Sequence, residues 1–163
     1  MLLCGLRSRE ILTLKLADVA FDLNRIKVHG KGNKERMLPM SNLVVDALGR
    51  YLNYERPQDS RCDELFVVMQ GKRRGLSMTR AGLRRIFRTR RLQAEIANAN
   101  PHRFRHTFGA DMARAGVRLP VLQKMMGHAH AETTLRYVNL SMADIADEYS
   151  RAVKRIEARY QDS

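Results

Sequence analysis

The feature that most constrains the fold is a hairpin pattern between residues 25 and 40. Arg25–His29 alternates polar and apolar side chains, and Lys34–Met40 returns as a second apolar-rich segment that ends near Pro39. The intervening Gly30-Lys31-Gly32-Asn33 contains the residue types that adopt positive φ in tight turns. We therefore expect two antiparallel strands with Lys31 at the tip of the turn.

Helical spacing of apolar residues dominates most of the remaining chain. Leu65–Met69 is a candidate third short strand. With 163 residues, the chain is long enough for one domain with a core of its own. The expected fold class is α+β, mainly α-helical with a small antiparallel three-stranded sheet. Cap, proline and glycine signals predict the helices Arg9–Leu16, Ser41 to Leu52, Thr79 to about Ala97, Pro101–Gly116, Pro120–Gly127 and Ser141–Tyr160.

The composition is strongly basic, with 30 Lys and Arg against 17 Asp and Glu, a net charge of +13 and a pI near 10.5. Such a charge favours a polyanionic partner, either nucleic acid or an anionic membrane surface. The apolar runs fall short of the roughly 18 to 20 residues of a spanning helix, so no membrane segment is predicted. The two cysteines, Cys4 and Cys62, are isolated from each other, which favours a reducing cytoplasm.

Both ends of the chain carry apolar helical patterns that need a partner surface. An apolar segment begins at Met1 without a preceding cap, which predicts a further N-terminal domain that this chain lacks. In the last predicted helix, an apolar stripe must dock either on its own domain or on another protomer. The stripe consists of Met142, Ile145, Tyr149, Val153 and Ile156.

An arginine-rich segment between Val67 and Ala94 contains nine basic residues and no acidic one. A solvated charged face is the ordinary explanation of such a run, but the absence of acidic residues within it favours a surface for a duplex backbone. Four of the arginines share one helical face, namely Arg80, Arg84, Arg88 and Arg91. The other basic residues are Lys72, Arg73, Arg74, Arg85 and Arg90.

Two further segments carry residues suited to phosphate chemistry. Pro101–His106 places His102 and Arg105 on one face at a helix start, where an anion is well held. His102 and His106 also have the spacing of a helical zinc pair, although the sequence offers no evident third ligand. Farther along, His128 precedes Tyr137 by nine residues. Taken alone, Tyr137 would be a packing aromatic, but phosphoryl transfer needs such a nucleophile beside cationic groups.

In this order, the segments resemble the motifs of the tyrosine recombinase and phage integrase family, over nearly the whole chain. The resemblance implies the DNA breaking and rejoining catalytic core, acting on double-stranded DNA without a metal or cofactor. The matching segments are Gly5-Leu6-Arg7-Ser8-Arg9-Glu10, Gly30-Lys31-Gly32-Asn33-Lys34-Glu35-Arg36, Pro101–Phe108, Ala115-Gly116-Val117 through Leu122, Gly127-His128 and Thr133-Thr134 with Tyr137.

The same resemblance implies a role for each matching residue. Tyr137 would attack the scissile phosphate and form a 3′-phosphotyrosyl bond. Arg7 and Arg105 would hold the non-bridging oxygens, and Lys31 would protonate the leaving 5′-oxygen. His102 and His128 would bind the phosphate or help to deprotonate Tyr137. Glu10 would orient an active-site side chain from behind.

This sequence departs from the family's motifs at two places near the tyrosine. Val138-Asn139 follow the tyrosine where the family often has Thr-His, and His130 is an additional histidine. The resemblance further implies a homotetramer on DNA, with the helix of residues 141–163 docking on a neighbouring protomer. Two other functions stay open: a non-catalytic duplex-binding module, and DNA relaxation of the type IB topoisomerase kind.

Overall fold

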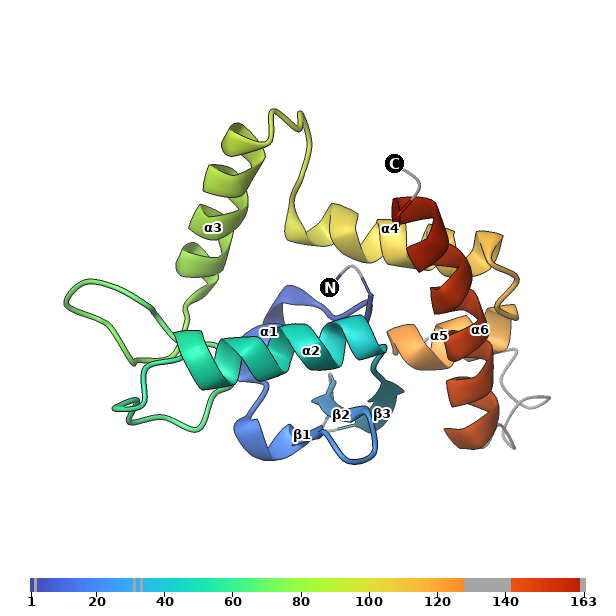
Figure 1. Ribbon diagram of the computed structural model, residues 1–163, viewed down its shortest axis with the longest axis horizontal. Helices are drawn as coiled ribbons and strands as arrows, with labels where there is room; N and C mark the ends of the chain where they lie inside the picture. Colours follow the sequence, from blue (N-terminus) through green and yellow to red (C-terminus); the bar gives the residue numbers. More distant parts are fainter. Residues whose placement is uncertain (2, 31, 33, 128–141, 162–163) are drawn as a thin grey trace.

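The computed structural model describes residues 1, 3–30, 32, 34–127 and 142–161, with side chains as far as Ala158 (Figure 1). The sheet and the short elements around it lie in the first third of the chain, and the long helices follow. The elements are α1 (Ser8–Thr13), a 3₁₀ turn (Leu16–Asp18), β1 (Val19–Ala20), β2 (Arg25–His29), β3 (Glu35–Pro39), α2 (Asn42–Arg50), a π-helical turn (Tyr51–Glu55), α3 (Arg80–Gln93), α4 (Pro101–Arg114), α5 (Leu119–Met126) and α6 (Met142–Gln161).

The predicted hairpin is present as β2 and β3, which pair antiparallel with Ile26 opposite Leu38 and Val28 opposite Arg36. The third strand of the sheet is β1, which pairs with β2 in the order β1-β2-β3. The prediction of a strand at Leu65–Met69 was wrong. That segment folds back on its own loop, because the amide of Val68 donates to Leu76 and the amide of Gly75 donates to Val68.

Several helix boundaries differ from the predicted ones for local reasons. The first helix begins at Ser8, with Arg7 as its N-cap, and ends at Thr13 instead of Leu16. Thr79 caps α3 as expected, since its side chain accepts a hydrogen bond from the amide of Gly82 at 3.1 Å. However, α3 ends at Gln93 instead of near Ala97, and Glu95 lies beyond it with a positive φ of 53°. That backbone conformation cannot continue a right-handed helix.

The hydrophobic core lies between β3, α4, α5 and α6, which contact one another (Figure 1). Four of the predicted stripe residues on α6, all except the half-buried Met142, are buried in the core of the same chain. Helix α3 contacts α1, and its Phe87 ring packs edge-on against that of Phe104 on α4 with the centroids 5.1 Å apart; the rest of the helix projects from the body (Figure 1). Within the described segments, no helix combines the length and the apolar character that crossing a bilayer requires.

Candidate active site

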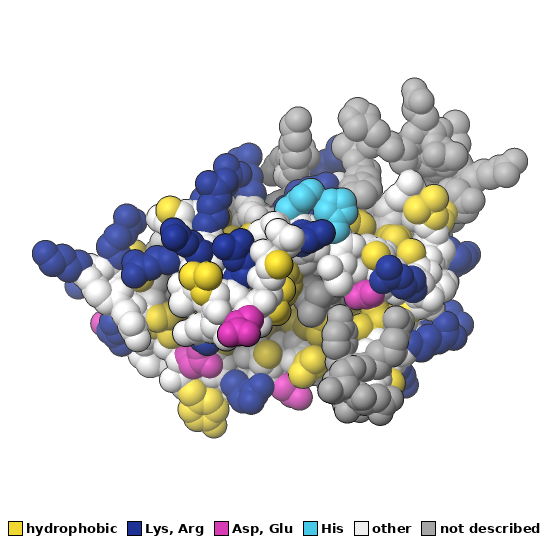
Figure 2. Space-filling model, turned by 90° about the horizontal axis from the view of Figure 1, so that it is seen from above, with side chains coloured by type: hydrophobic (Ala, Val, Ile, Leu, Met, Phe, Trp, Pro, Cys, Tyr) yellow, Lys and Arg dark blue, Asp and Glu magenta, His cyan; other side chains and the backbone are white. Residues whose placement is uncertain are grey.

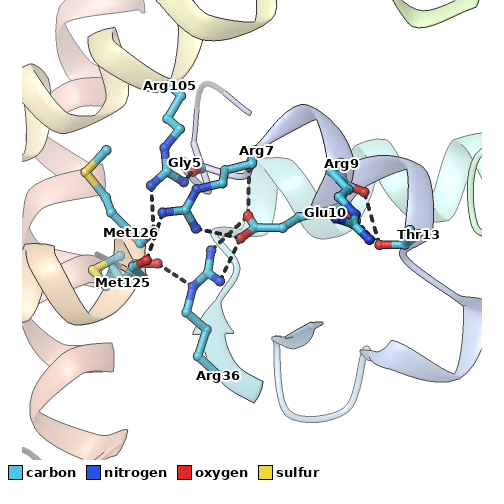
Figure 3. A network of polar contacts seen from close by, with 10 residues as sticks. Gly5, Arg7, Arg9, Glu10, Thr13, Arg36, Arg105, Met125 and Met126 are labelled. Atoms are coloured by element: carbon cyan, nitrogen blue, oxygen red, sulfur yellow. Dashed lines mark hydrogen bonds and ion pairs between the residues drawn. The ribbon is translucent and has the colours of Figure 1, made fainter. Parts of the chain in front are cut away.

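Three arginines from separate parts of the chain converge on the C-terminal end of α5 (Figure 3). Nε of Arg36 donates to the carbonyl of Met125 at 2.7 Å, and Nη2 of Arg105 donates to that of Met126 at 2.5 Å. Nη2 of Arg7 donates to the carbonyl of Gly127 at 2.8 Å. The last carbonyls of a helix lack partners within it and form the negative end of its dipole. They are therefore well suited to hold these three cations.

Gly127 is required at this helix end for two reasons. Its φ of 63° is left-handed, which disfavours any residue with a Cβ atom. A Cβ atom would also lie 3.0 Å from Nη1 of Arg36. The glycine thus permits the guanidinium of Arg36 to approach the backbone closely.

Glu10 is the carboxylate that joins two of the arginines (Figure 3). Its Oε1 and Oε2 accept from Nη1 and Nη2 of Arg36, both at 3.0 Å. Nη1 of Arg7 donates to Oε1 at 2.9 Å, and the amide of Arg7 donates to Oε2 at 2.8 Å. Burial raises the pKa of Glu10, but the hydrogen bonds from Arg36 and the Arg7 amide outweigh it and leave the pKa below its usual value.

Arg105 reaches the cluster from the buried face of α4. Its Nη1 donates to the carbonyl of Gly5, so that the side chain links the N-terminal segment to α5. Gly5 has a φ of +59°, and a Cβ atom there would overlap the ring of Phe108. Burial, and next the charge of Arg7, lower the pKa of Arg105 to about 10, so the guanidinium is still cationic at neutral pH.

The cluster carries a net positive charge that is open to solvent at one member. Three guanidinium groups face a single carboxylate, which leaves two positive charges in excess. The side chain of Arg7 is 39% exposed, whereas those of Arg36 and Glu10 are 11% and 3% exposed. An excess of positive charge with one accessible planar guanidinium can bind an anion such as a phosphate through paired hydrogen bonds.

His102 lies on the exposed side of α4, one turn before Arg105. The cap of this helix is Asn100, whose side chain accepts from the amide of Arg103 at 3.0 Å. Nε2 of His102 and Nε2 of His106 are 2.9 Å apart, as the predicted spacing of four residues allows. Over the described part of the chain, no group of three His, Cys, Asp or Glu side chains is arranged to hold a metal ion.

Three of the predicted site residues, Lys31, His128 and Tyr137, lie outside the described residues. The strands on either side of Lys31 are described, since β2 ends at His29 and β3 begins at Glu35. Likewise, Gly127 immediately precedes His128 and takes part in the arginine cluster. Of the residues assigned a catalytic or orienting role, the structure brings Arg7, Glu10 and Arg105 together and leaves His102 exposed.

The predicted basic surface follows the projecting helix α3. Arg80, Arg84 and Arg88 are exposed on it, and Arg91 is half-buried. On the face seen in Figure 2, Lys and Arg side chains gather around histidines, with few acidic side chains among them. The loop before α3 carries the exposed Lys72, Arg73 and Arg74.

One residue of this surface has an acidic partner that the sequence pattern concealed. Nη1 of Arg74 donates to both carboxylate oxygens of Asp59 at 2.9 Å. Asp59 precedes the acid-free segment and is brought back to it by the fold. Arg74 is therefore less available for an anionic partner than its neighbours.

Arg36 is the member of the cluster to which the sequence analysis assigned no role. It stands at the end of the Gly30–Arg36 motif and is the second residue of β3, where it is half-buried. The available signal was an arginine inside a predicted strand of mainly apolar residues, where a guanidinium needs an acidic or carbonyl partner. Its partners lie 26 and 89 residues away in sequence, and no local pattern reveals them.

Comparison with known proteins places this chain in a family and its fold in a class. The sequence profile of the phage integrase family matches residues 1–144, and the chain belongs to that family. The resemblance noted from the motifs is thereby confirmed. So is the fold class, α+β and mainly helical with a three-stranded antiparallel sheet.

Individual relatives are tyrosine recombinases. The chain is 34% identical over 149 residues to tyrosine recombinase XerC of Leptospira interrogans, covering 91% of this chain and 47% of the relative. It is 34% identical over 151 residues to tyrosine recombinase XerD of Staphylococcus epidermidis, covering 90% and 50%. The chain thus spans about half the length of these relatives.

Solved structures give the same result. The crystal structure of XerA recombinase matches with a TM-score of 0.70 and 33% identity, over 91% of this chain and 53% of that one. The integrase of mycobacterium phage Brujita matches with a TM-score of 0.68 and 25% identity, over 92% and 48%.

Proposed function

We propose that this chain is the catalytic domain of a site-specific DNA recombinase that cleaves and rejoins strands through a 3′-phosphotyrosyl intermediate. The observation that carries the proposal is the convergence of Arg7 and Arg105 on the end of α5, directly before His128. Membership in a family whose relatives are tyrosine recombinases supports it.

In the proposed reaction, the phenol oxygen of Tyr137 forms a bond to phosphorus as the bond from phosphorus to the 5′-oxygen breaks. Lys31 gives a proton to the departing 5′-oxygen, while His102 or His128 accepts the phenol proton or binds the phosphate. Arg7 and Arg105 stabilise the charge that grows on the non-bridging oxygens. The covalent phosphodiester keeps the bond energy for rejoining, so that no external energy source is needed.

Trapping of the covalent intermediate tests this function. We would use a pool of duplexes with variable sequence, each nicked so that cleavage releases a short fragment that carries the new 5′-hydroxyl, and isolate covalent complexes under denaturing conditions. The native chain and the control Tyr54→Phe, whose ring is 84% exposed, are expected to form adducts. Tyr137→Phe is expected to form none. An adduct with Tyr137→Phe would show that another residue is the nucleophile.

Two further measurements, duplex binding over a salt series and relaxation of supercoiled plasmid, separate the two other functions. Salt-sensitive duplex binding without any adduct would favour a non-catalytic DNA-binding module. Relaxation of supercoiled plasmid without a preferred sequence would favour an activity of the type IB topoisomerase kind. The basic residues proposed to contact DNA are Lys72, Arg73, Arg74, Arg80, Arg84, Arg88 and Arg91.

We further propose the assembly that goes with this function. Some structural neighbours are recombinases in complex with DNA, including a XerH recombinase bound to its difH substrate. By analogy, the protein would act on double-stranded DNA as a homotetramer in the cytoplasm, associated with the nucleoid. Helix α6 would then dock on a neighbouring protomer, and without DNA the chain would be a monomer or weak oligomer.

A further inference from the structure

The side chain of Arg36 donates more hydrogen bonds than those of Arg7 and Arg105, although Arg36 has no role in the proposed reaction. Its three donor nitrogens bind the Met125 carbonyl and both oxygens of Glu10, at 2.7, 3.0 and 3.0 Å. Its side chain is 11% exposed, so these hydrogen bonds are largely removed from water. Arg36 therefore faces the interior of the cluster, whereas Arg7 faces solvent.

The charge of Arg36 determines how strongly the Glu10 carboxylate neutralises the guanidinium of Arg7. Glu10 shares its Oε1 between the two arginines, and Arg36 occupies both of its oxygens. If Arg36 lost its charge, the buried carboxylate would turn to its other cationic partner, Arg7, and form a one-to-one pair. A guanidinium neutralised in this way holds a phosphate oxygen more weakly.

Arg36 also joins this cluster to the hairpin. It lies on β3 opposite Val28, five residues after Lys31 in the chain. Its bond to Met125 fixes β3 to the end of α5, where Arg7 and Arg105 are also attached. One side chain thus connects the strand that follows Lys31 with the groups that hold the phosphate.

We propose that Arg36 is a positioning residue that neutralises Glu10 and anchors β3 to α5, and thereby keeps the charge and orientation of Arg7 available to the scissile phosphate. This inference rests on the proposed function, since it assigns the anion at Arg7 to a DNA phosphate. Arg36 itself contacts no reacting atom.

The test compares Arg36→Gln with Arg36→Gln/Glu10→Gln in single-turnover formation of the covalent adduct. Because a displacement of about 1 Å costs roughly 100-fold in rate, we expect Arg36→Gln to slow the reaction about 10- to 100-fold. Removing the carboxylate in the double variant should recover part of that loss. Arg25→Gln, which removes a charge from the neighbouring strand opposite Pro39, serves as the control and should react like the native chain.

A neutral substrate distinguishes positioning from a general loss of structure. In a methylphosphonate linkage, a methyl group replaces one non-bridging oxygen, so much less negative charge needs stabilising by Arg7. The Arg36→Gln defect should therefore be much smaller on this linkage than on the phosphodiester. Equal slowing on both linkages, or a double variant no faster than the single one, would overturn the proposal.

Binding of inorganic phosphate tests the positioning role of Arg36 independently of adduct formation. Inorganic phosphate is titrated calorimetrically, and the part of the signal that disappears in Arg7→Gln defines binding at this cluster. Arg36→Gln should lose the same part and the double variant should regain some of it; phosphate binding unchanged in Arg36→Gln contradicts the proposal. If the native chain binds phosphate in this Arg36-dependent way but forms no adduct, the proposed function fails while the positioning role holds. If Arg36→Gln does not fold, Arg36→Lys tests the anchoring part of the role: it keeps the charge beside Glu10 but lacks the planar fork that reaches Met125 and both Glu10 oxygens, so phosphate binding should be kept while adduct formation slows.

Discussion

Glu10 is a carboxylate buried between two guanidinium groups, and its ionisation contributes to folding. Its pKa lies below the usual value near 4.5, so the stabilisation is fully present above that pH and is lost as the pH falls through the lowered pKa. Glu10→Gln leaves the charges of Arg7 and Arg36 without their partner. We expect a loss of about 3 kcal/mol in the free energy of unfolding at pH 7, as for other broken buried pairs.

Urea denaturation at pH 7 and at pH 3 measures this effect. The difference between the native chain and Glu10→Gln should shrink at the lower pH, because below the usual pKa the unfolded chain binds a proton at Glu10 more readily than the native chain does, and this favours unfolding of the native chain. A difference that is the same at both pH values would mean that the charge of Glu10 does not stabilise the fold.

At the residue scale, sequence reasoning found the members of the site that carry a recognisable motif and missed the one that depends on distant partners. Arg7, Glu10 and Arg105 were selected by their motifs, and the structure brings them together. Arg36 was within a quoted motif but received no role. Its function follows from Glu10 and Met125, and the distance between these residues in sequence hides their proximity.

The C-terminal end of α5 is the element that gathers the site, and Gly127 is its most sensitive position. An alanine there adopts left-handed backbone at a cost of roughly 1–2 kcal/mol, and its Cβ atom also displaces Arg36. Gly71→Ala is a matched control, because its φ of +79° is similar and nothing lies within 4 Å of the added atom. We expect Gly127→Ala to be more destabilising than Gly71→Ala in urea denaturation. Equal effects would show that Arg36 moves aside freely.

Helix α3 is the element whose charge the proposed DNA interface requires. Substitution of Arg80, Arg84 and Arg88 by Gln should lower the slope of log affinity against log salt by about 0.9 for each phosphate that the variant no longer neutralises. Fluorescence anisotropy of a labelled duplex over a salt series measures that slope. Arg74→Gln should change it less than any one of these substitutions, because Asp59 already pairs with Arg74. An unchanged slope in the triple variant would exclude α3 from the interface.

The strands show which elements can be predicted from local sequence patterns and which cannot. The hairpin was predictable because its turn residues and alternation act within sixteen residues of chain. Leu65–Met69 has the composition of a strand, yet the amide of its buried Leu65 donates to the carbonyl of Leu14 and that of its buried Val67 to the hydroxyl of Tyr51, so neither joins the sheet. The two-residue strand β1 was too short to leave a pattern. Which apolar segment joins the sheet is decided by tertiary packing rather than by propensity.

At the scale of the whole molecule, Tyr149 of α6 ties together regions at opposite ends of the chain. Its hydroxyl donates to the carbonyl of Leu3 at 2.9 Å and accepts from the amide of Ser41, the N-cap of α2, at 3.2 Å. The ring is 1% exposed, and burial raises the pKa of the phenol far above its usual value, so the hydroxyl keeps its proton. In the single chain, α6 therefore completes the core of its own domain.

Tyr149→Phe tests both this closure and the proposed exchange of α6 between protomers. Loss of the hydroxyl leaves the Leu3 carbonyl and the Ser41 amide unpaired, which should cost about 1–3 kcal/mol of unfolding free energy, whereas the exposed Tyr54→Phe should cost almost nothing. If α6 docks on its own domain in the absence of DNA, thermal unfolding of both variants is independent of protein concentration. A midpoint that rises with concentration would instead mean that the helix is already held by a second copy, because association stabilises the folded state by mass action.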